Sequence, residues 1–156
     1  MTTVRVSSTG TIDARPQTVY AIIADYHEGH PRIISEKYFS NLTVETGGIG
    51  AGTIIRFNVR LLGAVRTVRA EISEPSPGRV LVETDVETGA RTSFTVEPAN
   101  GGKRSIVTIE TAWTTPGLRG RIERMLAPAA LRRIYVQELR MLNEVASSAV
   151  RAGTSS

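Results

Sequence analysis

The longest regular pattern in the sequence lies at residues 131–150, which read LRRIYVQELRMLNEVASSAV. Its apolar residues recur every three or four positions, as they do on the buried face of an amphipathic helix. These residues are Leu131, Ile134, Tyr135, Leu139, Leu142, Val145, Ala146 and Ala149. Glu138 lies near the middle of that face, where a carboxylate costs free energy unless it has a partner or a use. The pattern therefore predicts a long C-terminal helix with one carboxylate on its buried side.

The segment before this pattern extends the expected helix back to Pro116 and is rich in arginine. Pro128 predicts a kink or break between a basic segment, about residues 118–126, and the main helix. Six arginines fall in this region, namely Arg119, Arg121, Arg124, Arg132, Arg133 and Arg140. We expect them either to form the solvated face of the helix or to attract an acidic partner or an anionic membrane surface. The sequence has no nucleic-acid recognition motif, so nucleic-acid binding is not expected.

The rest of the chain consists mainly of short runs in which apolar and polar residues alternate, the pattern of half-buried strands. The clearest run covers residues 54–61, where the apolar set is Ile55, Phe57, Val59 and Leu61. In the run at residues 80–86, one face of the expected strand carries Val80, Val82, Thr84 and Val86. Other runs cover residues 4–12, 42–44, 67–73, 94–96 and 107–113, with turn residues between them. The sequence thus predicts seven consecutive strands.

Two short helices are expected between the first and second strands. Pro16 suits the first turn of a helix, which we expect to end near Asp25. Glycine and proline then interrupt the pattern, and a second helix is expected at about residues 33–39.

Consecutive strands joined by short turns form an antiparallel sheet, and its apolar face needs a cover. Seven strands span roughly 34 Å, whereas one helix with its side chains is only about 10–12 Å wide. The sheet must therefore curl around the C-terminal helix, while the two short helices close one end. We predict an α+β fold in which a curved seven-stranded sheet wraps a long helix around an internal cavity lined by apolar side chains.

The composition fits one compact domain, which we expect to cover residues 1–150 and to be followed by a disordered tail at residues 151–156. Hydrophobic residues make up 40% of the 156 residues, and charged residues make up 22%. The absence of cysteine removes disulfides, thiolate nucleophiles and cysteine metal sites. The sequence shows neither a charged-then-apolar leader nor an apolar run of spanning length. We therefore expect a cytoplasmic protein, and both a monomer and a homodimer remain open.

Four local features and the order of the elements carry a resemblance to a known group of proteins. The features are residues 12–20 (IDARPQTVY), 50–53 (GAGT), 74–79 (EPSPGR) and the amphipathic C-terminal helix. From about Val4 to Val150, the chain resembles the helix-grip (SRPBCC) superfamily of START lipid-transfer domains and the birch-pollen allergen. It is most similar to the bacterial polyketide cyclase/dehydrase and lipid-transport branch.

This resemblance implies a helix-grip fold with an elongated cavity, which agrees with the fold expected from the residues alone. Members of the superfamily include lipid and hormone binders, aromatic-polyketide cyclases and chaperone co-activators. The chain departs from a common pattern after the first helix, where many relatives have a tryptophan beside a proline. Here the stretch reads HPRII at residues 30–34, so the shape of the expected lid differs.

Few residues in the sequence could carry chemistry, and the catalytic candidates are His30, Arg66, Tyr135 and Glu138. Arg66 shares the inward parity of Val68, so we hypothesise that it pairs with Glu138 or is bridged to it by a ligand. His30 could act as an acid, a base or a hydrogen-bond donor. The two histidines match no metal-binding spacing, so no metal and no cofactor are expected. The expected cavity lining is Phe57, Val59, Arg66, Val68, Val82, Phe94, Val96, Ile109, Trp113, Tyr135, Glu138 and Leu142.

These observations favour three functions in descending order. The first is binding, and possibly transport, of a hydrophobic small molecule such as a lipid, a polyketide or an aromatic compound. The second is a polyketide cyclase or dehydratase that uses the same cavity, since positioning alone supplies much of the rate in such reactions. The third is an interaction protein that acts through the basic surface of Arg119, Arg121 and Arg124.

Overall fold

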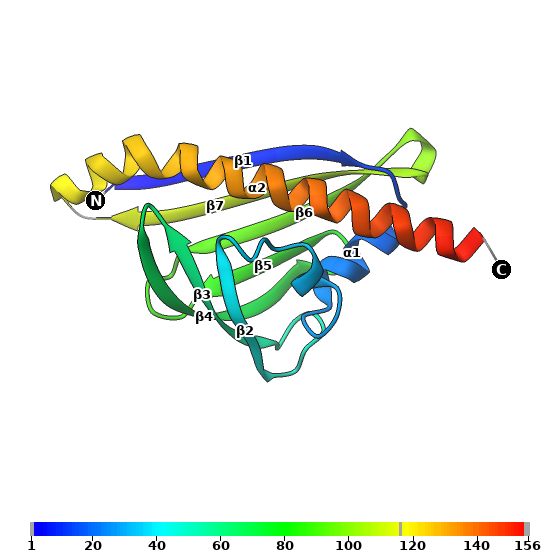
Figure 1. The fold of residues 1–156 in the computed structure, drawn as a ribbon, viewed down its shortest axis with the longest axis horizontal. Helices are drawn as coiled ribbons and strands as arrows, with labels where there is room; N and C mark the ends of the chain where they lie inside the picture. The colour runs from blue at the N-terminus through cyan, green and yellow to red at the C-terminus, as the bar shows by residue number, and fades with distance from the viewer. Residues whose placement is uncertain (1, 116, 155–156) are drawn as a thin grey trace.

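The chain forms one curved antiparallel sheet and one long helix (Figure 1). The structure is a computed structural model that describes the backbone of residues 2–115 and 117–154 and the side chains of residues 3–114 and 128–153. The strands are β1 (Thr2–Ile12), β2 (Phe39–Thr46), β3 (Ile54–Leu61), β4 (Ala64–Ser76), β5 (Val80–Asp85), β6 (Arg91–Ala99) and β7 (Arg104–Thr115). The helices are α1 (Pro16–Ala24) and α2 (Gly117–Thr154), with single 3-10 turns η1 (His30–Arg32) and η2 (Asn100–Gly102). This confirms the predicted α+β helix-grip architecture of seven curved antiparallel strands and a long C-terminal helix.

The order of strands in the sheet is β1-β7-β6-β5-β4-β3-β2, and each neighbouring pair is antiparallel. Figure 1 shows α2 running alongside β1, with β2, β3 and β4 curling away below the helix. The sheet therefore has two edges, β1 and β2, and α2 lies along the first of them. A Cβ on Gly10 of β1 would lie 3.4 Å from Leu139 Cδ1, so this glycine permits the close approach of the helix.

The inner face of the sheet is defined by residues that lie opposite one another in the strand register. Leu81, Phe94 and Ile109 form one such row across β5, β6 and β7, and all three are buried. The helix contributes the other half of the core through the buried residues Ile134, Tyr135, Leu139, Leu142 and Ala146. This is the apolar face that the 3.6-residue pattern predicted, with Glu138 buried inside it. The face ends one turn early, because Ala149, expected on it, is exposed.

The structure corrects the second short helix and the C-terminal tail. The segment expected to be helical at residues 33–39 contains no helix; η1 ends at Arg32, and Phe39 begins β2. Proline in the first turn and the preceding glycine favour a single tight turn there. Residues 151–154, expected to be disordered, continue α2 to Thr154.

The helix α2 runs across Pro128 without the break that this proline predicted. Of the six arginines, Arg132, Arg133 and Arg140 are exposed on the side of α2 away from the core. The side chains of Arg119, Arg121 and Arg124, which carried the interaction hypothesis, lie outside the described side chains.

Candidate functional site

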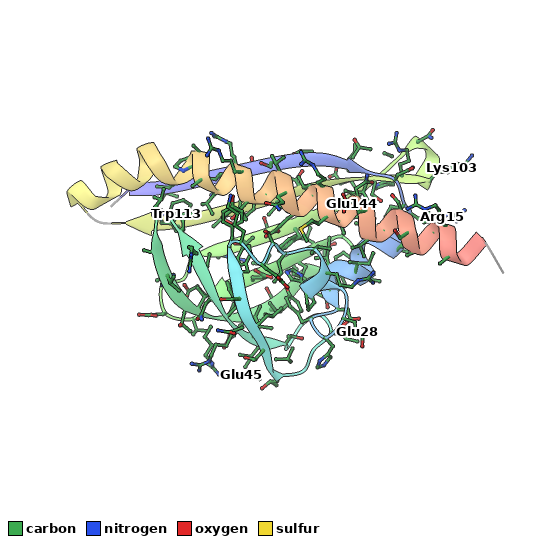
Figure 2. All side chains as sticks on the ribbon, viewed as in Figure 1. Arg15, Glu28, Glu45, Lys103, Trp113 and Glu144 are labelled. Atoms are coloured by element: carbon green, nitrogen blue, oxygen red, sulfur yellow. The ribbon has the colours of Figure 1, made fainter. Side chains whose placement is uncertain are left out.

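The interior between the sheet and α2 is fully buried at one end and partly exposed at the other. At the end where α1 lies, inner-face residues such as Ile55 and Val107 are buried. Toward the opposite end, Phe57, Val59 and Trp113 are only half-buried. Figure 2 shows Trp113 at the left of the molecule, at the opposite end from α1. Apolar inner-face side chains are therefore accessible from the end at which β3 finishes.

A buried polar cluster lies within this interior, with Glu83 of β5 at its centre. The Tyr26 hydroxyl donates to Glu83 Oε1 at 2.7 Å. His30 Nε2 lies 3.5 Å from the same oxygen. The orientation of the His30 ring is set by a second contact, in which Nδ1 donates a hydrogen bond to the Ile23 carbonyl oxygen at 2.8 Å. The rings of Tyr26 and His30 stack with their centroids 4.4 Å apart, so the segment after α1 directs a phenol and an imidazole onto one carboxylate.

Glu138 approaches the same region from α2. It is 4% exposed, and its Oε2 is the one buried side-chain polar atom among the described residues that has no hydrogen-bond partner. Burial raises the pKa of this carboxyl well above its ordinary value of 4.5, and the negative charge of Glu83 raises it further. Glu138 thus favours the neutral carboxyl form, which can both donate and accept a hydrogen bond.

Tyr135 precedes Glu138 by one turn of α2 and has partners in the sheet. Its hydroxyl forms a short hydrogen bond with Thr111 Oγ1, which in turn lies 2.7 Å from Thr92 Oγ1. Burial raises the pKa of Tyr135 above its ordinary value, despite the hydrogen bond shared with Thr111, and the charges of Glu138 and Glu83 add to the increase. Tyr135 is therefore a neutral phenol held in place by the two threonines.

The hypothesised pair of Arg66 and Glu138 is wrong, because Arg66 has a different partner. Arg66 lies at the exposed end of β4, opposite Val59, and its Nη2 donates to Asp85 Oδ2 at 2.6 Å. Asp85 also accepts hydrogen bonds from the Thr88 hydroxyl at 2.8 Å and from the backbone N–H of Glu87 at 2.9 Å. Arg66 thus anchors the β5–β6 turn, and its side chain remains 44% exposed.

Most of the predicted lining residues lie on the inner face. Val68, Phe94, Val96, Ile109, Tyr135, Glu138 and Leu142 are buried there, and Phe57, Val59 and Trp113 are half-buried. Val82 is a correction, because it lies opposite Ser73 and Ser93 on the other face of the sheet. The inward residues of β5 are Leu81, Glu83 and Asp85.

The sequence reasoning therefore missed Glu83 and Asp85. Residues 80–82 are all apolar, so either alternate set of residues in β5 could point inward. The prediction placed Val80 and Val82 inward, which turned Glu83 and Asp85 outward. The size of Leu81 was the available signal for the other parity, since the larger apolar side chain gains more from burial.

The family model described as polyketide cyclase / dehydrase and lipid transport matches residues 3–147. The chain belongs to this family. The resemblance stated from the sequence is thereby confirmed, and with it the relation to START-like and birch-pollen-allergen-like folds. No curated protein matches the chain.

Several solved structures share the fold over nearly the whole chain. The KanY protein is 34% identical, with a TM-score of 0.80, over 94% of this chain and 99% of its own. The Zhui aromatase/cyclase from Streptomyces sp. R1128 is 19% identical, with a TM-score of 0.78, over 97% of this chain and 98% of its own. A START superfamily protein from Mycobacterium smegmatis is 15% identical, with a TM-score of 0.69, over 93% and 98%. The last two similarities establish the fold alone.

Two further observations concern metal binding and membrane spans among the described residues. Their His, Asp and Glu side chains form no group of three that could hold a metal ion. None of their helices is long and apolar enough to cross a membrane.

Proposed function

We propose that the protein binds a hydrophobic small molecule bearing a hydroxyl or carbonyl group, between the inner face of the sheet and α2. The observation that carries this proposal is Glu138, a buried carboxyl whose Oε2 has no partner among the described residues. An unpartnered buried polar atom costs about 1–3 kcal/mol. That cost is offset when a ligand supplies the missing hydrogen bond.

The surroundings of Glu138 define the kind of ligand that fits. Most side chains between the sheet and α2 are apolar, which favours an apolar body such as a lipid chain, a polyketide or an aromatic ring. A neutral Glu138 carboxyl can accept from a hydroxyl or donate to a carbonyl. The charge of Glu83 disfavours a second anion in the same region, so a buried ligand carboxylate fits poorly.

A matched set of three ligands tests this proposal by calorimetry or fluorescence titration. Naphthol, methylnaphthalene and naphthoate have similar size and differ in one group. We expect naphthol to bind about fivefold more tightly than methylnaphthalene, the equivalent of one neutral hydrogen bond, and naphthoate to bind most weakly. In the variant Glu138→Leu, naphthol and methylnaphthalene should bind equally.

The matched control is Glu144→Leu, the same substitution at an exposed position of α2. It should leave all three affinities unchanged. Failure of all three ligands, and of longer lipids and polyketides, to bind the wild-type protein would refute the proposal. Binding that is equally tight for methylnaphthalene and naphthol would support a passive container and remove the role of Glu138.

A second candidate function is a cyclase or dehydratase reaction on a poly-β-ketone held in the same interior. It is supported by the family description and by a neutral carboxyl, which can act as a general acid toward a ketone oxygen. Among the four catalytic candidates, Glu138, Tyr135 and His30 are buried, whereas Arg66 is held by Asp85 at the exposed end.

A short poly-β-ketone thioester supplies the test of this second candidate. If Glu138 is the general acid, Glu138→Gln should slow cyclisation about a hundredfold while substrate affinity changes little. An unchanged rate in this variant would remove Glu138 from the chemistry and leave the binding function as the account of the site.

A further inference from the structure

The hairpin between β3 and β4 ends in a strained turn that exposes a leucine. Leu61 and Ala64 are the last paired residues, so Leu62 and Gly63 form a two-residue loop. Both have positive φ, 52° for Leu62 and 79° for Gly63, as in a type I′ turn. Asparagine, aspartate and glycine are the residues that favour the first position, because a bulky side chain is disfavoured in the left-handed region.

The Leu62 side chain is not buried against the rest of the chain, so packing within the protein does not offset this strain. Leu62 is 58% exposed, and Val65, three residues later, is 59% exposed. We call Leu62 and Val65 the apolar tip. A costly backbone conformation combined with exposed apolar side chains is typical of a site that meets something outside the chain.

Basic side chains lie directly behind the apolar tip. Arg60 is opposite Val65 in the register of β3 and β4. Arg60, Lys37 and Val65 line a surface groove of about 340 Å³, together with Tyr38 and the acidic Glu36. Neither Arg60 nor Lys37 forms an ion pair with any described carboxylate, although Lys37 lies over the Tyr38 ring. The groove therefore offers two cations against one acid.

The geometry points to a membrane-docking surface, in which the apolar tip inserts into an anionic lipid membrane and Arg60 and Lys37 contact lipid phosphates. Apolar side chains at the depth of the acyl boundary, with cations at the level of the head groups, are the two contributions that hold peripheral proteins on anionic membranes.

A membrane fits this surface better than a protein partner does. Stable protein interfaces bury about 800 Å² on each side and have a packed apolar centre. The apolar tip has two side chains at the end of a narrow hairpin, which is too small for such a centre but sufficient to insert between lipids. The charge of the groove selects an anionic surface over a neutral one.

The apolar tip lies at the end of the molecule where the interior is partly exposed. Phe57 and Val59, on the strand that leads to Leu62, are half-buried on the inner face. Figure 1 shows the β3–β4 hairpin at the left, the same end at which Figure 2 places Trp113. Docking would therefore bring the accessible end of the interior toward the lipid, although docking itself does not depend on ligand binding.

Vesicle sedimentation of the full chain without added ligand tests this proposal. The probes are vesicles of phosphatidylcholine alone and vesicles that contain about one quarter phosphatidylserine. We expect binding to the mixed vesicles and little binding to the neutral ones. The variant Leu62→Asn/Val65→Thr should bind the mixed vesicles about tenfold more weakly or worse.

This variant separates docking from folding. Asparagine followed by glycine is the preferred type I′ turn, and threonine keeps the β-branched shape of valine. Its unfolding midpoint should therefore be no lower than that of the wild-type protein, so lost binding would not reflect lost structure. The matched control is Ile49→Thr, since Ile49 is 70% exposed at the opposite end of β3 and should leave vesicle binding unchanged.

The charge contribution is tested by Lys37→Gln/Arg60→Gln. This variant should lose most of the preference for the mixed vesicles over the neutral ones. Failure of the wild-type protein to bind the mixed vesicles would overturn the proposal, as would equal binding by the Leu62→Asn/Val65→Thr variant. Loss of binding in Ile49→Thr of the same size would overturn it too, because the contact would then not be specific to the apolar tip.

Discussion

Asp85 and Glu138 are two carboxyls that have little contact with solvent and behave in opposite ways. Asp85 is 6% exposed and Glu138 is 4% exposed. Burial alone would raise the pKa of Asp85, but hydrogen bonds from the Glu87 backbone N–H, Arg66 and Thr88 outweigh it, so its pKa lies below the ordinary value of 3.8. Glu138 has no such set of donors, and its pKa lies well above the ordinary value.

This difference shows that hydrogen-bond partners, as well as the depth of burial, decide what a buried carboxyl can do. Asp85 has its hydrogen bonds satisfied by the chain and closes the β5–β6 turn, so it is a structural residue. Glu138 has hydrogen-bonding capacity left over inside an apolar interior. Four measurements can break or sharpen this contrast.

The largest expected effect is the loss of stability on replacing Asp85. The variant Asp85→Ala removes the acceptor of Arg66 and Thr88 and of the turn N–H groups. We expect the free energy of unfolding to fall by about 3 kcal/mol, measured by urea denaturation at neutral pH. The control Arg66→Gln should cost only about 1 kcal/mol, because its side chain is partly exposed and Asp85 keeps its turn hydrogen bonds. A loss below 1 kcal/mol for Asp85→Ala would contradict the structural role.

The corresponding substitution at Glu138 should act in the opposite direction. Glu138→Leu replaces a buried carboxyl, whose Oε2 has no partner among the described residues, with an apolar side chain. We expect the free energy of unfolding to rise by about 2 kcal/mol, while the preference for a hydroxylated ligand disappears. If this variant is destabilised instead, Glu138 has a structural partner and the contrast with Asp85 fails.

The pH dependence of stability provides a third comparison. Because the folded-state pKa of Glu138 is raised, the folded protein keeps a proton that the unfolded chain releases above its ordinary value of 4.5. Stability should therefore fall as pH rises from about 4.5 toward the folded-state pKa, by at most about 1.4 kcal/mol per pH unit for one proton. The lowered pKa of Asp85 has the opposite effect on stability. Its contribution is lost as pH falls, and only at pH values below about 3.8.

Parallel urea titrations of the wild-type protein and Glu138→Gln isolate this effect. The difference in unfolding free energy between them should grow with pH above 4.5 in favour of the glutamine variant. The unfolding free energy of the control Glu144→Gln, at an exposed position, should change with pH in the same way as that of the wild-type protein. A constant difference between the wild-type protein and Glu138→Gln across this range would argue against a raised pKa.

The smallest expected effect concerns Tyr26, which donates to Glu83. Tyr26→Phe removes one hydrogen bond at 2.7 Å and keeps the ring that stacks on His30. The free energy of unfolding should fall by about 1 kcal/mol in urea denaturation. No loss at all would indicate that Glu83 does not depend on Tyr26 for its place in the cluster.

Much of the fold was predictable because its patterns were long or clearly periodic. The C-terminal helix carried enough apolar positions to define a single face, and Ile55 to Leu61 alternated without ambiguity. The segment at residues 33–39 was not predictable in this way. Its Ile33, Ile34 and Phe39 fit either a short helix or a turn leading into a strand, and the pairing of Phe39 with Val59 decided for the strand.

The candidate site was predictable only where a single residue broke a strong pattern. Glu138 stood out because every neighbour on its helix face was apolar. The acids of β5 did not stand out, because the three consecutive apolar residues at positions 80–82 fit either face of the strand and the face of Val80, Val82, Thr84 and Val86 was predicted to point inward. Arg66 was correctly predicted to lie on the inner face of β4. Its partner Asp85 could not be predicted, because no spacing in the sequence indicates the hydrogen bonds of the turn that Asp85 begins.

A crystal structure with naphthol or a longer hydroxylated ligand tests the central claim most directly. The account predicts a ligand between the sheet and α2, with its hydroxyl oxygen about 3 Å or less from Glu138 Oε2. A ligand bound on the outer surface would contradict the account. So would a ligand whose hydroxyl points to the exposed end near Trp113 while Glu138 Oε2 remains without a partner.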